Sequence, residues 1–118
     1  PFRFDLAWLR GLVRERARAA GLTPRQVVDL VLAVGEAAAN TVRHAGGQGT
    51  LKIWPDQTGI VCEVADRGRA SDPRTGQRPP PPGSGGGQGL WVILQACDQV
   101  ELRSGDHGTV IRMHMHRS

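Results

Sequence analysis

The chain has 118 residues and a mass of 12.7 kDa, which suits one compact domain and is too small for two of ordinary size. Hydrophobic residues make up 39% of the sequence and charged residues 22%, which excludes an intrinsically disordered protein. No apolar run is long enough to cross a membrane and no signal-peptide pattern is present, so we expect a cytoplasmic protein with no membrane partner. Because the sequence starts at Pro1 and not at a methionine, a fragment of a larger regulator is a further expectation.

The net charge of +4 would permit a nucleic-acid partner, but the distribution of the charge argues against one. All basic residues except Lys52 are arginines, and they are scattered along the chain apart from one cluster between Arg10 and Arg18. The sequence has no tyrosine, and its few Phe and Trp residues provide no platform on which bases could stack. We therefore expect no direct contact with nucleic acid.

Residues that commonly bind metals are not grouped in a metal-binding pattern. Cys62 and Cys97 lack a Cys-x-x-Cys spacing, which favours two reduced thiols over a metal site or a disulfide. His114 and His116, with His107 nearby, alternate along an expected strand, and this arrangement is more typical of a solvated face than of a metal site.

Two helices are predicted in the first part of the chain. Apolar residues recur at helical spacing from Asp5 to Ala20, and Gly21 ends this helix. A second helix begins at Thr23, which forms a capping-box pattern with Gln26 and precedes a proline, and it ends at the glycine pair 46–47.

The remaining elements are two hairpins and a third helix. Branched apolar residues predict strands over 51–54 and 60–65, joined by a turn over 55–59. A stretch dominated by glycine and proline, 67–89, precedes a short helix over about 90–97. A second hairpin follows, with strands over 100–104 and 109–116. This order predicts an α+β fold, a two-layer sandwich with helices on one face of a mixed, mainly antiparallel sheet.

Glu36, Asn40 and His44 are four residues apart on the second helix and therefore share one stripe, opposite its apolar side. An exposed helix face normally carries long charged side chains, whereas the neighbours here include Ala33 and Ala37. The helix is expected to be covered, or to face a ligand, on both sides. A solvated face that carries Glu and Asn by chance is the alternative that the spacing leaves open.

Two further motifs indicate a ligand. Asp66 ends an apolar strand at the sheet edge, and Gly68 would let a ligand approach the backbone, although a simple turn uses the same residue types. The glycine-rich run over 83–90 leads into a helix, where exposed amides and the helix dipole suit a phosphate. It lacks the Gly-Lys-Ser/Thr of a Walker loop, and a flexible linker is its alternative.

In this order and spacing the three motifs resemble the GHKL superfamily of ATP-binding domains, whose fold is the Bergerat sandwich. The resemblance is greatest to the anti-sigma factor serine/threonine kinases and related actinobacterial regulatory domains. It is carried by the segments Glu36–Ala45, Gly87–Trp91, Cys97–Glu101 and Gly108–Arg112. Because it covers essentially the whole chain, we expect a single histidine-kinase-like ATPase domain over residues 1–118.

The resemblance implies that the cofactors are ATP and Mg²⁺ and assigns roles on the second helix. Asn40 would coordinate the Mg²⁺ ion, since a hard cation needs oxygen ligands. Glu36 would be the general base that activates the acceptor hydroxyl or a water. Arg43 would support the site from the end of the helix.

The resemblance also implies how the nucleotide is held. Asp66 would accept the adenine amino hydrogen with help from Thr109, and Gly68 would leave space beside the base. The residues expected at the phosphates are Gly87, Gly89 and Leu90. Residues 70–88 would form a mobile lid over the bound ATP.

The implied function is phosphorylation of an anti-anti-sigma (STAS-type) antagonist and sequestration of a sigma factor, by a protein that forms a homodimer. Two departures from the family pattern fall in the lid, where Ala70 replaces the last glycine of an Asp-x-Gly-x-Gly box and Pro79–Pro82 favour extended geometry. They leave open a nucleotide-gated protein-binding module without phosphotransfer. The catalytic module of a multidomain sensor kinase is a further alternative, although this chain has no helix pair carrying a phosphoacceptor histidine.

Overall fold

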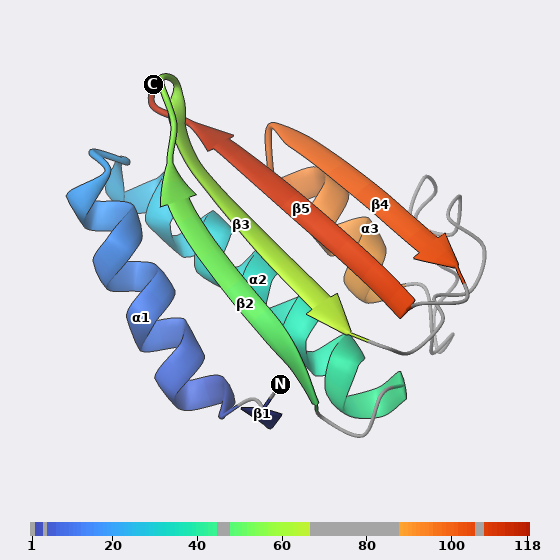
Figure 1. Cartoon of the computed structure of the whole chain (residues 1–118). Helices are drawn as coiled ribbons and strands as arrows, with labels where there is room; N and C mark the ends of the chain where they lie inside the picture. The colour runs from blue at the N-terminus through green and yellow to red at the C-terminus, as the bar shows by residue number, and fades with distance from the viewer. Residues whose placement is uncertain (1, 4, 45–47, 67–87, 106–107) are drawn as a thin grey trace.

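The computed structural model describes residues 2–3, 5–44, 48–66, 88–105 and 108–118 (Figure 1). Helix α1 (Leu6–Ala19) begins where Asp5 Oδ1 accepts a hydrogen bond of 3.2 Å from the Trp8 backbone N–H. It ends before Gly21, whose φ of +88° is a conformation that favours glycine. Helix α2 (Pro24–His44) begins with the predicted capping box, in which Thr23 and Gln26 exchange two hydrogen bonds of 3.0 and 3.2 Å. The predicted starts of both helices are confirmed.

The strands form one five-stranded sheet in the order β1-β2-β3-β5-β4, in which every described pair is antiparallel. The strands are β1 (Phe2–Arg3), β2 (Gln48–Pro55), β3 (Gly59–Asp66), β4 (Gln99–Gly105) and β5 (Gly108–His116). Helix α3 (Gln88–Ala96) precedes β4, and β5 then returns between β3 and β4. This return explains why the described sheet has no parallel pair, although a mixed sheet was expected. The predicted two-layer α+β sandwich is confirmed, and β1 is an addition to it.

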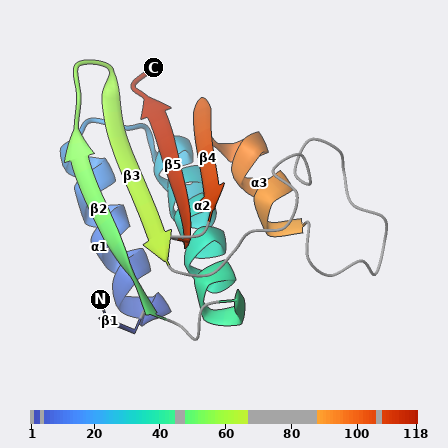
Figure 2. The same cartoon turned by 45° about the vertical axis from the view of Figure 1, so that its right-hand side comes forward.

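All three helices cover the same face of the sheet (Figures 1 and 2). Helix α2 packs against α1, against α3 and against the central strands. Every second residue of β3 and β5 faces this helical layer, because side chains alternate across a strand. The buried strand residues of the core are Ile60, Cys62, Val64, Ile111, Met113 and Met115. They pack against Leu30, Val34 and Ala38 of α2, which are fully buried.

The opposite face of the sheet is closed at its centre by a charged cluster. Glu63 is only 8% exposed, and its Oε1 accepts hydrogen bonds from Arg112 Nη2 at 2.8 Å and Nε at 3.1 Å. The Arg112 guanidinium also lies 5.4 Å from the ring centre of Trp54, within cation–π range. Glu101 contacts both Arg112 and His114, at 3.7 and 3.5 Å. Strand β3 is therefore buried on both faces, although one of its outward residues, Glu63, is charged.

The cysteines and histidines have different surroundings. Cys62 and Cys97 are both buried and free, and burial raises the pKa of each thiol to about 12. Both thiols therefore stay protonated at neutral pH. His116 is exposed, as expected of a solvated face, but the His114 side chain is only 18% exposed because it packs beside Glu101. No helix in the described ranges has the length and apolar character needed to cross a membrane.

Strand β3 begins at Gly59, where β5 passes so closely that a methyl group would overlap the Met115 carbonyl oxygen. We expect Gly59→Ala to lower the free energy of unfolding by about 2 kcal/mol or more, because the obstacle is backbone and cannot move aside. Thermal denaturation should show a Tm lower by about 8 °C. Gly105→Ala is the matched control, because its added methyl group would meet nothing within 4 Å. Equal effects of the two substitutions would contradict this close approach.

Candidate functional site

The polar residues predicted on the strands meet at one end of the core. Asp66 is the last residue of β3 and pairs with Thr109 of β5 in the antiparallel register. Both continue the alternation of core residues on their strands, so both side chains face the helical layer. Thr109 is buried, and its hydroxyl lies 3.4 Å from the hydroxyl of Ser104 on β4. The apolar face of the sheet thus finishes, at this end of β3 and β5, in a carboxylate and a hydroxyl.

Helix α2 is hydrogen-bonded to this end of the sheet through Thr41. The Thr41 hydroxyl donates a hydrogen bond of 2.9 Å to Asp66 Oδ2, and the Thr41 side chain is completely buried. A hydrogen bond from a buried hydroxyl holds the carboxylate in one orientation. Thr41 was not among the predicted site residues. The signal that could have indicated it is a β-branched hydroxyl residue beside Asn40, on a turn otherwise formed by alanines.

Glu36 and Asn40 lie one turn apart on α2, and both are partly buried. Asn40 directly precedes Thr41. Ala33 and Ala37 are fully buried, which confirms that α2 is covered on a second side. The cause is the packing of α2 between α1 and α3. A fully solvated face, the alternative left open by the sequence, does not agree with this burial.

Gly89 and Leu90 lie in the first turn of α3, where both are buried. This turn presents backbone N–H groups that have no partner within the helix, and helix α3 packs against α2. Arg43 lies in the last turn of α2, but its side chain is outside the described part. Gly68, Gly87 and all of the expected lid except its last residue also lie outside the described residues.

The described groups have complementary chemical capacities. The Asp66 carboxylate can accept a hydrogen bond from an amino group, and the Asn40 amide oxygen is a ligand type that suits a hard cation. A carboxylate such as Glu36 can take a proton from a hydroxyl. The N-terminal turn of α3 can donate hydrogen bonds to an anion. Together these capacities match a nucleotide phosphate, its metal ion and a phosphate acceptor.

Comparison with protein families agrees with this chemistry. The model of the histidine kinase-like ATPase domain matches residues 5–115, which is almost the whole chain. The chain therefore belongs to the histidine kinase-like ATPase family, and the resemblance to the GHKL superfamily is confirmed.

The chain is also similar to a particular kinase. It is 31% identical over 111 residues to the serine-protein kinase RsbW of Halalkalibacterium halodurans, and the match covers 82% of this chain and 67% of that protein. Family and relative together support an ATP-using, kinase-like domain.

The contact between Thr41 and Asp66 can be measured as a coupling energy. In a double-mutant cycle of Thr41→Val and Asp66→Ala, chemical denaturation should give a coupling of about 1 to 3 kcal/mol, because the hydrogen bond involves a charged group. The control cycle combines Thr41→Val with Asp98→Ala, since Asp98 accepts its hydrogen bond from the backbone of His116 instead. A coupling near zero for the first cycle would mean that the Thr41 hydroxyl does not hold Asp66 in solution.

Proposed function

We propose that this chain is a serine/threonine-protein kinase domain that uses ATP and Mg²⁺ to regulate transcription. Its substrate is an anti-anti-sigma antagonist of the STAS type, and in the absence of that antagonist it sequesters a sigma factor. The observation that carries the proposal is the similarity to a serine-protein kinase in a chain that keeps Glu36, Asn40 and Asp66 on adjoining elements. The proposal includes a cytoplasmic homodimer, built from one ATPase domain per chain, that makes no direct contact with nucleic acid or membrane.

The described residues fit a bound nucleotide. Asp66 is partly buried at the end of β3, where the Thr41 hydroxyl donates a hydrogen bond to its carboxylate and leaves an oriented hydrogen-bond acceptor at that end of the sheet. Such an acceptor suits the amino group of adenine, and Thr109 lies beside it in the register. Asn40 supplies an amide oxygen for Mg²⁺, and the turn at Gly89 and Leu90 supplies N–H donors for the phosphates. Family motifs extend this set to Gly68, Gly87 and Arg43, with residues 70–88 as the lid.

Phosphotransfer requires a group that removes the proton of the acceptor hydroxyl. Glu36 lies one turn from Asn40, a rise of about 6 Å along the helix axis. From this position Glu36 would take the proton of an acceptor serine hydroxyl. Bound ATP with Mg²⁺ would supply the γ-phosphoryl group, whose phosphorus bonds to the serine oxygen as its bond to the departing ADP breaks. Asn40 would hold the Mg²⁺ ion.

Nucleotide binding is the first part to test. At a concentration about a hundredfold above the dissociation constant, ATP with Mg²⁺ should stabilise the domain by about 2.7 kcal/mol and raise its Tm by about 10 °C. Asp66→Asn should abolish this shift. An amide can still accept the Thr41 hydrogen bond, but it presents a donor to the donor group of adenine.

Asp98→Asn is the matched control, because it makes the same chemical change at an aspartate remote from the site in the register. It should keep the full shift in Tm. If no adenine nucleotide shifts the Tm of the unaltered chain, the proposed function is wrong.

Glu36→Gln should separate nucleotide binding from phosphotransfer. The amide keeps the size of the side chain but cannot take a proton, so transfer of radiolabelled phosphate to a STAS-type protein should fall by about a hundredfold or more. The ATP-induced shift in Tm should stay unchanged, because this residue does not hold the nucleotide. Glu15→Gln, at an exposed position of α1, serves as the control and should keep full transfer. If the unaltered chain binds ATP but phosphorylates no STAS-type protein, the nucleotide-gated binding module replaces the kinase.

A further inference from the structure

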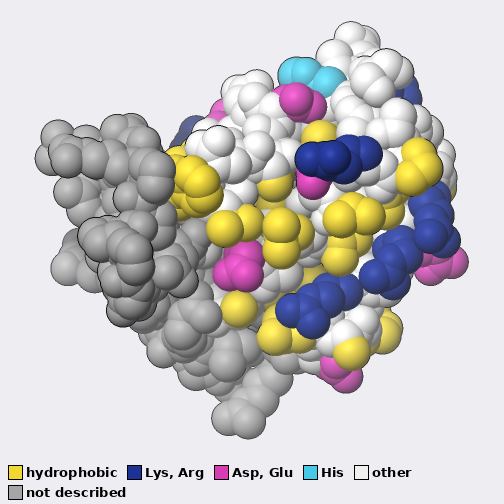
Figure 3. All heavy atoms as spheres, turned by 180° about the vertical axis from the view of Figure 1, so that it is seen from behind, with side chains coloured by type: hydrophobic (Ala, Val, Ile, Leu, Met, Phe, Trp, Pro, Cys, Tyr) yellow, Lys and Arg dark blue, Asp and Glu magenta, His cyan; other side chains and the backbone are white. Residues whose placement is uncertain are grey.

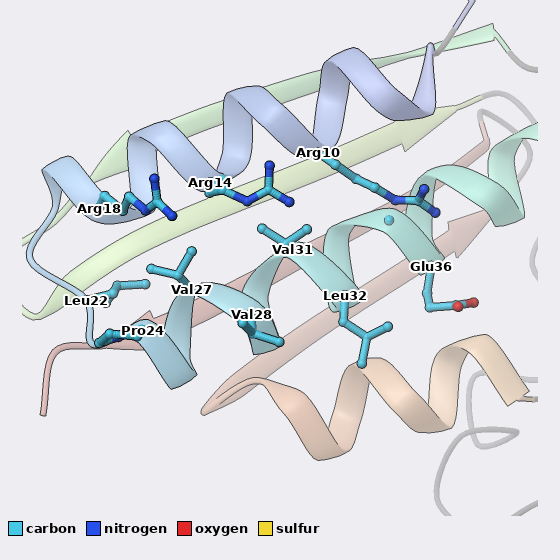
Figure 4. A pocket seen from close by; sticks show the side chains of 11 residues that line it. Arg10, Arg14, Arg18, Leu22, Pro24, Val27, Val28, Val31, Leu32 and Glu36 are labelled. Atoms are coloured by element: carbon cyan, nitrogen blue, oxygen red, sulfur yellow. The ribbon is translucent and has the colours of Figure 1, made fainter.

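A groove of about 480 Å³ runs between α1 and α2 on the surface of the helical layer (Figure 4). Arginines of α1 line one side of it, and apolar side chains of α2 line the other. Seen from the helix side, basic side chains border a strip of apolar ones (Figure 3). Its lining includes Arg10, Arg14 and Arg18 of α1 and Val28, Leu32 and Glu36 of α2.

The three arginines form a basic rail along the groove. Arg10, Arg14 and Arg18 follow one another at intervals of four residues on one side of α1. Their Cα atoms are therefore spaced by about 6 Å along the helix axis. All three are exposed, and Figure 4 shows their side chains extending beside α2. In the part of the chain that the structure describes, none of the three guanidinium groups forms a salt bridge or a hydrogen bond. Each therefore remains available to a carboxylate from outside.

The apolar side of the groove is equally regular. Val28 is 63% exposed and Leu32 is 48% exposed, and they follow one another by one turn of α2. Val31, whose side chain lies on the side of α2 toward α1, is half-buried and packs against the core (Figure 4). Large aliphatic side chains this exposed, next to one another in a groove, are typical of a protein-binding surface.

We propose that this groove docks an amphipathic helix of a protein partner. The apolar stripe of that helix packs on Val28 and Leu32, and carboxylates along its flank pair with the basic rail. A partner helix fits because carboxylates four residues apart repeat at the same spacing of about 6 Å as the arginines. The groove follows α2 from Pro24 to Glu36, or about 18 Å, which corresponds to a helix of about three turns.

The chemistry of the groove favours this partner over a nucleic acid. None of the described residues that line the groove is aromatic, so those residues provide no surface on which bases could stack. Its apolar side would instead be buried by the leucines or isoleucines of an amphipathic helix, as in other helix-in-groove complexes. The proposal concerns docking alone and holds whether or not Glu36 acts as a base.

The test uses a fluorescein-labelled synthetic peptide of about 14 residues, with leucines and glutamates placed at helical spacing on adjoining stripes. Fluorescence anisotropy with the full 118-residue chain, without nucleotide, measures its binding. The peptide should bind saturably, and both Leu32→Ser and the double variant Arg14→Glu, Arg18→Glu should weaken binding by about tenfold or more. All substituted side chains are exposed, so folding is checked by thermal denaturation of each variant.

Arg16→Glu is the matched control, because Arg16 is an exposed arginine of the same helix that does not line the groove. It should change the affinity by less than about twofold.

Equal weakening by Arg16→Glu would overturn the proposal, and so would unchanged affinity for a peptide with glutamine in place of every glutamate. Absence of saturable binding would also overturn it. Complete competition by a single-stranded oligonucleotide would assign the groove to polyanions, and loss of a dimer in Leu32→Ser on sedimentation would assign it to a second copy of the chain.

Discussion

The arrangement of the whole molecule depends on the burial of α2 on more than one side. Leu30, Val34 and Ala38 pack toward the sheet, while Ala33 and Ala37 are also fully buried in this helix, which packs against both α1 and α3. Because alanine adds little bulk, neighbouring helices can approach this side closely. The remaining side of α2 carries its exposed and partly exposed side chains, among them Val28, Leu32, Glu36 and Asn40. Close packing therefore decides where chemistry can occur on this helix.

The polar edge of the core depends on the same helix. The alternation of β3 and β5 brings Asp66 and Thr109 to the helical face, and the antiparallel register makes them neighbours. A carboxylate at the end of an apolar face must be hydrogen-bonded to remain there, and the buried Thr41 hydroxyl provides one such bond. Thr41 adjoins Asn40 in the chain, so one turn of α2 both closes the core and presents the proposed metal ligand.

Features that depend on local sequence were predicted well, and features that depend on distant pairs were not. The capping box at Thr23, the stop at Gly21 and the two hairpins follow from neighbouring residues, and the structure confirms them. The contact between Thr41 and Asp66 joins residues 25 positions apart, and no periodicity indicates it. The pairing of Glu63 with Arg112 spans 49 positions and buries a charged residue on the outer side of β3, and neighbouring residues in the sequence do not indicate it. Strand β1 has only two residues, too few to show a period.

Glu36 belongs both to the groove between α1 and α2 and to the stripe of α2 that carries Asn40. It closes the groove beside α1, and it precedes Asn40 by one turn on the stripe proposed to face the nucleotide. Gly35 precedes Glu36 at this junction, where an added methyl group would lie 3.2 Å from Nε of the flexible Arg10 side chain. A helix docked in the groove would therefore end beside the proposed base. A partner's serine would need only a short segment after such a helix to reach Glu36, so docking and catalysis can share a partner while using separate residues.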